Sequence, residues 1–88
     1  MKNMKLVIVN WMDSSSRTGW WNIGAIKKDK VLLCRSVGWI VKENKEHIVL
    51  APHITDWRKH KNLKIQGSGI ISIPMKAIKK IETLKTWI

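Results

Sequence analysis

Apolar residues fall into five short runs along the chain, and turn-forming residues separate one run from the next. The runs are rich in valine and isoleucine, which fit the pleated surface of a sheet better than the interior of a helix. They predict five β-strands over residues 4–12, 31–41, 47–51, 70–73 and 78–84. In the first strand both alternating sets of side chains are apolar, so we expect this strand to be covered on both faces.

Glycine, proline and small polar residues mark where the predicted strands end or bend. The cluster DSSSRTG at 13–19 favours a turn, because its side chains bond the local backbone. Residues 42–46 predict a hairpin turn, and Pro52 and Pro74 stop the strands before them. Gly38 lies among large apolar residues, which indicates a bulge or a sharp bend in the second strand.

Two segments do not follow the strand pattern. Trp20, Ile23 and Ile26 recur at a spacing of three, which predicts one or two helical turns lying on the core. Residues 53–66 show no sustained period and carry many charges, so we expect them to form an exposed excursion, which the glycines of residues 67–69 bring to an end.

Five short strands and one helical segment suit a small barrel. An open sheet of this size would expose its edge strands, and closure hides them. We therefore expect a mainly β fold, a small five-stranded barrel with one short helical segment after the first strand. Eighty-eight residues suffice for one domain, so the barrel should span residues 1–88.

The order of these elements resembles that of small Sm-like β-barrels. The likeness covers roughly residues 5–84 and is carried by a bent strand, a hairpin and a proline-anchored turn. The matching segments are SVGW at 36–39, LAPH at 50–53, GIISIP at 69–74 and IKKI at 78–81.

More narrowly, the chain is similar to short phage and prophage proteins of unassigned function that begin with a Trp-x-Asp-Ser pattern, here residues 11–14. This resemblance implies a barrel, a ring or dimer, a phage origin, and binding of nucleic acids, nucleotides or host proteins. Two features of true Sm proteins are missing from the sequence. A full helix has no room before Lys5, and no Asp-x-x-Asn motif lies in the second or third strand, so the Sm nucleotide pocket is not carried over.

The chain is strongly basic. Seventeen lysines and arginines against six aspartates and glutamates give a net charge of +11, so we expect an anionic partner. A hydrophobic content of 44% excludes a disordered basic tail, because such tails lack the apolar surface that folding needs.

No apolar run approaches the roughly 18–20 residues of a membrane span. The single Cys34 fits a reducing compartment, and we expect a cytoplasmic protein, in the host cytoplasm if a phage encodes it, with no membrane partner.

The sharpest signal for a binding site is a group of cations beside a tryptophan in the excursion. This first basic group consists of Trp57, Arg58, Lys59, Lys61 and Lys64. Cations attract phosphates, and an aromatic face adds about 1–3 kcal/mol per stacked base.

A second basic group follows near the C-terminus and would share a face with the first if the last strand closes beside the excursion. Its members are Lys76, Lys79, Lys80 and Lys85. The alternative for both groups is a solvated surface that serves solubility.

Two further features could touch a ligand. Trp20 and Trp21 are adjacent, so both cannot point into one core, and one of them should cover a ligand or a second subunit. The subunit interface is favoured, because tryptophan is enriched at interface hot spots. Arg17 ends a run of hydroxyl side chains that could cradle a phosphate. The commoner role of such a run is to cap a turn or the next helical segment.

Catalysis has no recognisable signature in the chain. A Ser/His/Asp set could be drawn from the serines at 14–16 with His53 and Asp56, or a pair from Cys34 and a histidine, but neither has a nucleophile elbow. The three histidines, spaced six and seven residues apart, share no helical face that could hold a metal. We therefore predict that the protein is not an enzyme and that it has no cofactor and no metal site.

These observations favour a non-catalytic binding protein for a phosphate-bearing ligand, with single-stranded nucleic acid as the leading candidate and a homo-oligomer as the assembly. The alternative is a phage counter-defence protein that sequesters a small or cyclic nucleotide signal or inhibits a host protein. The predicted ligand-binding residues are the whole first basic group, Lys76, Lys79 and Lys80 of the second, and Arg17, Trp20 and Trp21.

Overall fold

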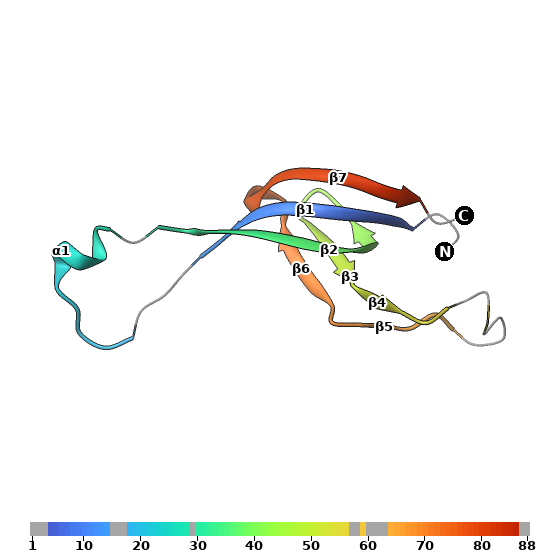
Figure 1. The fold of residues 1–88 in the computed structure, drawn as a ribbon, viewed down its shortest axis with the longest axis horizontal. Coiled ribbons are helices and arrows are strands. Elements are labelled where there is room, and N and C mark those ends of the chain that lie inside the picture. Colours follow the sequence, from blue (N-terminus) through green and yellow to red (C-terminus); the bar gives the residue numbers. More distant parts are fainter. Residues whose placement is uncertain (1–3, 15–17, 29, 57–58, 60–63, 87–88) are drawn as a thin grey trace.

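A computed structural model describes residues 4–14, 18–28, 30–56, 59 and 64–86. The fold is mainly β, as predicted, and Figure 1 shows its elements. They are β1 (Lys5–Asp13), α1 (Ile23–Ile26), β2 (Leu32–Glu43), β3 (His47–Ala51), β4 (His53–Ile54), β5 (Gly67–Ser68), β6 (Ile71–Pro74), the 3₁₀ helix η1 (Met75–Ala77) and β7 (Ile78–Thr86). The five predicted strands correspond to β1, β2, β3, β6 and β7, and their ends differ from the predicted ones by at most two residues.

The five long strands form one antiparallel sheet in the order β6-β3-β2-β1-β7. The expected closed barrel is not formed in the described part of the chain, because β6 and β7 are the two edges of the sheet and do not pair with each other. Between them lies η1, whose Met75 N–H donates to the carbonyl oxygen of Glu46 at 2.8 Å. Closure depends on how far the whole sheet curls, and no local sequence pattern specifies that curvature.

The predicted excursion also contains regular structure. β4 and β5 pair as a short antiparallel hairpin, with His53 opposite Ser68 and Ile54 opposite Gly67. Two-residue strands carry no alternation long enough to detect in a sequence, which is why the pattern predicted none here. Figure 1 shows this hairpin at one end of the sheet.

The core lies on one face of the sheet. Its fully buried side chains are Val7, Val9, Ile48, Leu50 and Ile73. The register builds this cluster, because Ile48 lies opposite Ile73. Several partly buried side chains complete the layer, and they include Met75 and Ala77 of η1.

Gly38 has a packing role that differs from the predicted bulge. The register shift in β2 lies two residues later, between Ile40 and Lys42, and Gly38 itself pairs with Val7. A Cβ at Gly38 would lie 3.1 Å from both the backbone carbon and the carbonyl oxygen of Ala51. Gly38 therefore lets β3 cross close to β2.

We expect Gly38→Ala to lower the free energy of unfolding by about 1–3 kcal/mol, because the added methyl group meets backbone atoms that cannot move aside. Urea unfolding followed by tryptophan fluorescence measures the loss. Lys42→Ala, an exposed change in the same strand, is the matched control and should leave the midpoint almost unchanged. Equal midpoints for the wild type and the Gly38 variant would contradict the packing role of this glycine.

The opposite face of β1 and β2 is the outer face of the sheet. It carries Leu6 and Ile8 from β1 and, directly opposite them, Trp39 and Val37 from β2. Leu6, Ile8 and Trp39 are only half-buried, and Val37 is 50% exposed. The prediction that the first strand is covered on both faces is therefore wrong: one face of β1 builds the core, and the other lies on the surface.

The described residues between β1 and β2, which are 14, 18–28, 30 and 31, project from the sheet as an arm that carries α1 (Figure 1). The chain measures 58 × 24 × 20 Å and has a radius of gyration of 17.1 Å, against about 12 Å for a compact domain of this length. The predicted helical turn exists, and the Asn22 side chain caps it by accepting a hydrogen bond from the Gly24 N–H at 2.8 Å. Its predicted place on the core is wrong, because α1 has no buried residue.

Candidate functional site

A cleft of about 430 Å³ lies at the base of the arm, where β1 and β2 leave the sheet. Its walls come from three adjacent strands, β2, β1 and β7. The lining residues are Asn10, Trp11, Leu33, Cys34, Arg35 and Lys79. The cleft therefore combines an indole with two cationic side chains, and none of its lining residues is acidic.

The strand register brings these residues to one end of the sheet. Trp11 and Cys34 lie on the core side and Asn10, Leu33 and Arg35 on the outer side, so the cleft lies at the open edge of β1, next to the point where β7 begins to pair with it. Trp11 lies opposite Cys34 in β2 and opposite Ile78 in β7. The β1–β7 pairing is irregular at this point, since Asn10 pairs with Lys80 and the next residue pairs with Ile78, so Lys79 is the extra residue of a bulge. Bulges redirect a side chain out of the regular alternation. The bulge explains how Lys79 of β7 lines the same cleft as residues of β1 and β2.

The Trp11 indole is held in a fixed orientation. Its Nε1–H donates to the Ser36 hydroxyl oxygen at 3.0 Å, across to the neighbouring strand. The ring is half-buried and packs against the core cluster. Because the indole N–H is already hydrogen-bonded to Ser36, the part of the ring that lines the cleft presents an apolar surface.

The surroundings of the cleft are electropositive. Arg35 and Lys79 are exposed, and so are Lys76 in η1 and Lys80 in β7. Lys80 makes an ion pair with Glu82 at 3.0 Å, with side chains that are 67% and 43% exposed. Exposed pairs of this kind contribute little free energy and are screened by salt. An anion that enters the cleft would thus meet the cations of β2 and β7 directly.

Three of the four lysines of the second basic group lie away from the described lysines of the first. The fourth, Lys85, pairs with Leu6 at the end of the sheet that also carries the β4–β5 hairpin. Lys76, Lys79 and Lys80 lie near the cleft, because β7 begins beside the end of β1, where Ile78 faces Trp11. Lys59 and Lys64 are exposed and lie beyond the β4–β5 hairpin, which follows the end of β3. That end lies near the start of β1, at the opposite end of the sheet (Figure 1). The expectation of one shared basic face is wrong for Lys76, Lys79 and Lys80.

The remaining predicted ligand-binding residues divide into two sets. Trp20 and Trp21 lie on the arm, where Trp20 is fully exposed and the Trp21 Nε1–H donates to the Thr18 carbonyl oxygen at 2.7 Å. The others fall outside the described residues and stay predictions. They are Arg17, Trp57, Arg58 and Lys61.

Of the six lining residues, only Lys79 is among the predicted ligand-binding residues. The sequence pattern predicts no binding role for Trp11 or Arg35. A signal for Arg35 was present, because it is the single charged residue within the apolar run 31–41. A charge in the middle of a strand that otherwise reads as buried indicates a residue at the rim of a sheet or cleft.

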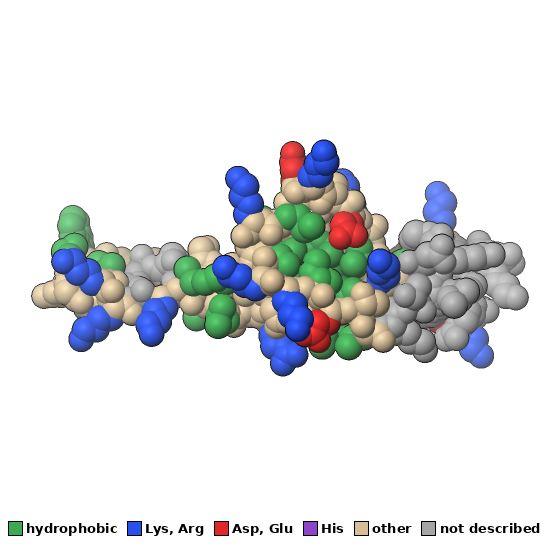
Figure 2. All heavy atoms as spheres, turned by 90° about the horizontal axis from the view of Figure 1, so that it is seen from above, with side chains coloured by type: hydrophobic (Ala, Val, Ile, Leu, Met, Phe, Trp, Pro, Cys, Tyr) green, Lys and Arg blue, Asp and Glu red, His purple; other side chains and the backbone are tan. Residues whose placement is uncertain are grey.

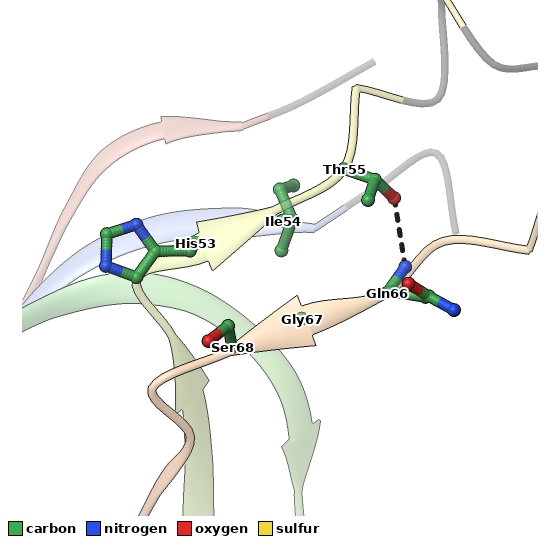
Figure 3. A pocket seen from close by; sticks show the side chains of 6 residues that line it. All are labelled: His53, Ile54, Thr55, Gln66, Gly67 and Ser68. Atoms are coloured by element: carbon green, nitrogen blue, oxygen red, sulfur yellow. Dashed lines mark hydrogen bonds between the residues drawn. The ribbon is translucent and has the colours of Figure 1, made fainter.

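A second, smaller hollow of about 260 Å³ lies along the β4–β5 hairpin (Figure 3). Its lining residues are His53, Ile54, Thr55, Gln66, Gly67 and Ser68. The hairpin is pinned at this point by two hydrogen bonds: the Thr55 N–H donates to the Gln66 carbonyl oxygen at 2.9 Å, and the Gln66 N–H donates to Thr55 Oγ1 at 3.0 Å. With one histidine and no fixed charge in its lining, this hollow offers no counterion for a phosphate.

Two of the described residues considered for catalysis, Ser14 and His53, lie far apart. Ser14 follows β1 at the arm, and His53 lies in β4 at the other end of the sheet, so the register keeps them apart. Among the described residues, no group of three His, Cys, Asp or Glu side chains is placed to hold a metal ion. Neither helical segment of the described chain has the length and apolar character that a membrane-spanning helix needs.

Comparisons with protein-family models, with curated proteins and with solved structures gave no match to this chain.

Proposed function

We propose that the protein is a non-catalytic binder of a phosphate-bearing ligand, most plausibly single-stranded nucleic acid, which it engages at the cleft at the base of the arm. The observation that carries this proposal is the joint placement of Trp11, Arg35 and Lys79 in one hollow. Cations supply affinity for phosphates regardless of sequence, and an aromatic wall supplies a surface for a base or sugar.

Single-stranded nucleic acid suits the cleft better than a duplex. Proteins that bind single strands combine a positive groove with aromatic side chains against which unstacked bases can lie. In a duplex the base faces are already stacked on one another, so an indole wall gains nothing from them. Lys76 and Lys80 beside the cleft could contact phosphates that flank the bound nucleotide.

A small nucleotide is the second candidate, because the cleft volume would also accommodate one alone. It would fit the phage counter-defence role that the resemblance to short phage proteins and Sm-like barrels suggests. A sequestered signal would fill the cleft by itself, so affinity would not grow with oligonucleotide length. A nucleic-acid binder gains affinity with each additional phosphate that reaches a cation.

Fluorescence anisotropy with a labelled oligothymidine across a salt series tests the proposal. If Arg35 and Lys79 each contact one phosphate of a single strand, the logarithm of the binding constant should fall with the logarithm of salt concentration with a slope of about −1.4 or steeper. A mononucleotide competitor should be much weaker than the oligonucleotide. Absence of binding at low salt, or affinity that ignores salt, would rule the proposal out.

A further inference from the structure

The arm carries large apolar side chains that the described chain leaves wholly or partly exposed. Trp20 is fully exposed, Ile23 is 66% exposed and Ile26 is 39% exposed. Trp21, next to them, keeps 52% of its surface exposed. Large apolar groups that gather on one projecting segment are typical of an interaction surface rather than of a solvated loop.

The conformation of the arm also needs external support. α1 has four residues, one of them Gly24, and none of its residues is buried. Isolated helices shorter than about 12–15 residues are marginal in water, and helices in proteins owe most of their stability to packing of an apolar face. The apolar side of this short helix therefore requires a surface to pack against.

The sheet of the same chain carries an apolar surface on which the apolar arm could pack. The outer face of the sheet, made of Leu6, Ile8, Val37 and Trp39, is an apolar strip on β1 and β2. The described elements that pack most closely on these two strands are their neighbours in the sheet and η1, which lies on the core side. Figure 2 shows hydrophobic side chains gathered on the arm and, separately, on the body of the molecule, with charged side chains around them.

We propose that the arm docks on the outer face of a second copy of the chain, and that the partner's arm docks in return. A twofold dimer needs a surface that complements itself, and one chain that carries both an apolar arm and an apolar strip meets this requirement. An aromatic side chain buries about 150–250 Å² when covered, so Trp20, half of Trp21 and Ile23 together offer on the order of 400 Å².

Reciprocal docking doubles the contact for each copy. The strip offers less area than the arm, because three of its four side chains are already half-buried. One arm and one strip together then bury roughly 600–700 Å² per partner, toward the lower end of the range of standard stable interfaces. The charge of +11 on each copy opposes this association, and dissolved salt screens the repulsion. Salt should therefore tighten the dimer, whereas it weakens binding of nucleic acid.

Sedimentation velocity of the whole chain over a concentration and salt series tests the dimer. The wild type should sediment as a dimer that becomes tighter as salt rises. The double variant Trp20→Ser/Ile23→Ser should be a monomer with an unchanged far-ultraviolet circular dichroism spectrum, because neither residue contacts the core. Lys28→Ser, an exposed change on the same arm, is the matched control and should stay dimeric. A monomeric wild type, or a double variant that still forms the dimer, would overturn the proposal.

A mixing experiment tests whether the arm meets this particular face. Val37→Lys should also yield a monomer, since it places a charge in the apolar strip. A mixture of this variant with the double arm variant allows one intact contact, between the arm of the first and the strip of the second. Mixed dimers should therefore reappear at high protein and salt concentrations, with a lower affinity than the wild-type dimer because half of the contact area remains. A mixture that stays monomeric would contradict arm-to-face docking. The nucleic-acid titration separates this outcome from a failure of the proposed function, because salt acts on the two equilibria in opposite directions.

Discussion

Replacing Ile48 by alanine is expected to lower the free energy of unfolding by about 2–5 kcal/mol. Ile48 is fully buried at the centre of the core and faces Ile73 across the β3–β6 pair. Domains below about 70–80 residues rarely gain more than 3–5 kcal/mol from one core, and this chain, which leaves a long arm outside its core, stands close to that limit. The variant should therefore be largely unfolded in buffer, as tryptophan fluorescence and circular dichroism would show.

Ile70→Ala is the matched control for this core variant. Ile70 lies directly before β6 and is 52% exposed, so the same chemical change removes little buried surface. Its urea midpoint should stay close to that of the wild type. Equal losses for the two variants would mean that the core is not centred on Ile48 as described.

The double variant Arg35→Ala/Lys79→Ala is expected to weaken binding of single-stranded oligonucleotides at least tenfold. Hydrogen bonds to charged groups contribute about 1.5–3 kcal/mol each, and this variant removes both cations that line the cleft. The slope of log affinity against log salt should also become shallower by about 1.4, since two phosphate contacts are lost. Anisotropy titrations of the wild type and the variant at several salt concentrations measure both effects.

A second pair of lysines provides a control of equal charge. Lys42 is the second-last residue of β2, next to the hairpin turn that holds Lys45, and both side chains are exposed away from the cleft residues. The variant Lys42→Ala/Lys45→Ala loses the same two charges, so it corrects for the general positive field of the protein. It should bind almost as tightly as the wild type. Equal weakening in the two double variants would show that the overall charge, and not the cleft, determines binding.

Most of the fold could be predicted because its signals are local. The apolar run of β1, the proline after β3 and the proline at the end of β6 each act within a few residues of the chain, and they place these strand ends to within one residue. The spacing of Trp20, Ile23 and Ile26 likewise predicts the helical turn.

Features that depend on how distant parts of the chain meet could not be predicted from local signals. The helical turn of the arm packs on nothing in its own chain, although its apolar spacing is the one that a helix on a core would have. Whether β6 and β7 meet depends on the curvature of five strands together. Lys76, Lys79 and Lys80 share no face with the described lysines of the first basic group, because the strand order places the start of β7 and the β4–β5 hairpin at opposite ends of the sheet.

The cleft exists because of the way β1 pairs with β2 and β7. Trp11, Arg35 and Lys79 are far apart in the sequence, and they meet because three strands pair in one particular alignment with a bulge at Lys79. A shift of one residue in either pairing would turn these side chains to other faces of the sheet. No spacing rule along the chain reveals such a site.

Nuclear magnetic resonance titration of the protein with an oligothymidine tests the cleft most directly, because each of the six tryptophans gives its own indole N–H signal. The Trp11 indole signal and the backbone amide signals of Arg35 and Lys79 should shift together and saturate with one affinity. Shifts confined to residues 53–56 and 64–68 of the opposite hairpin, or no shifts at all, would contradict binding at the base of the arm.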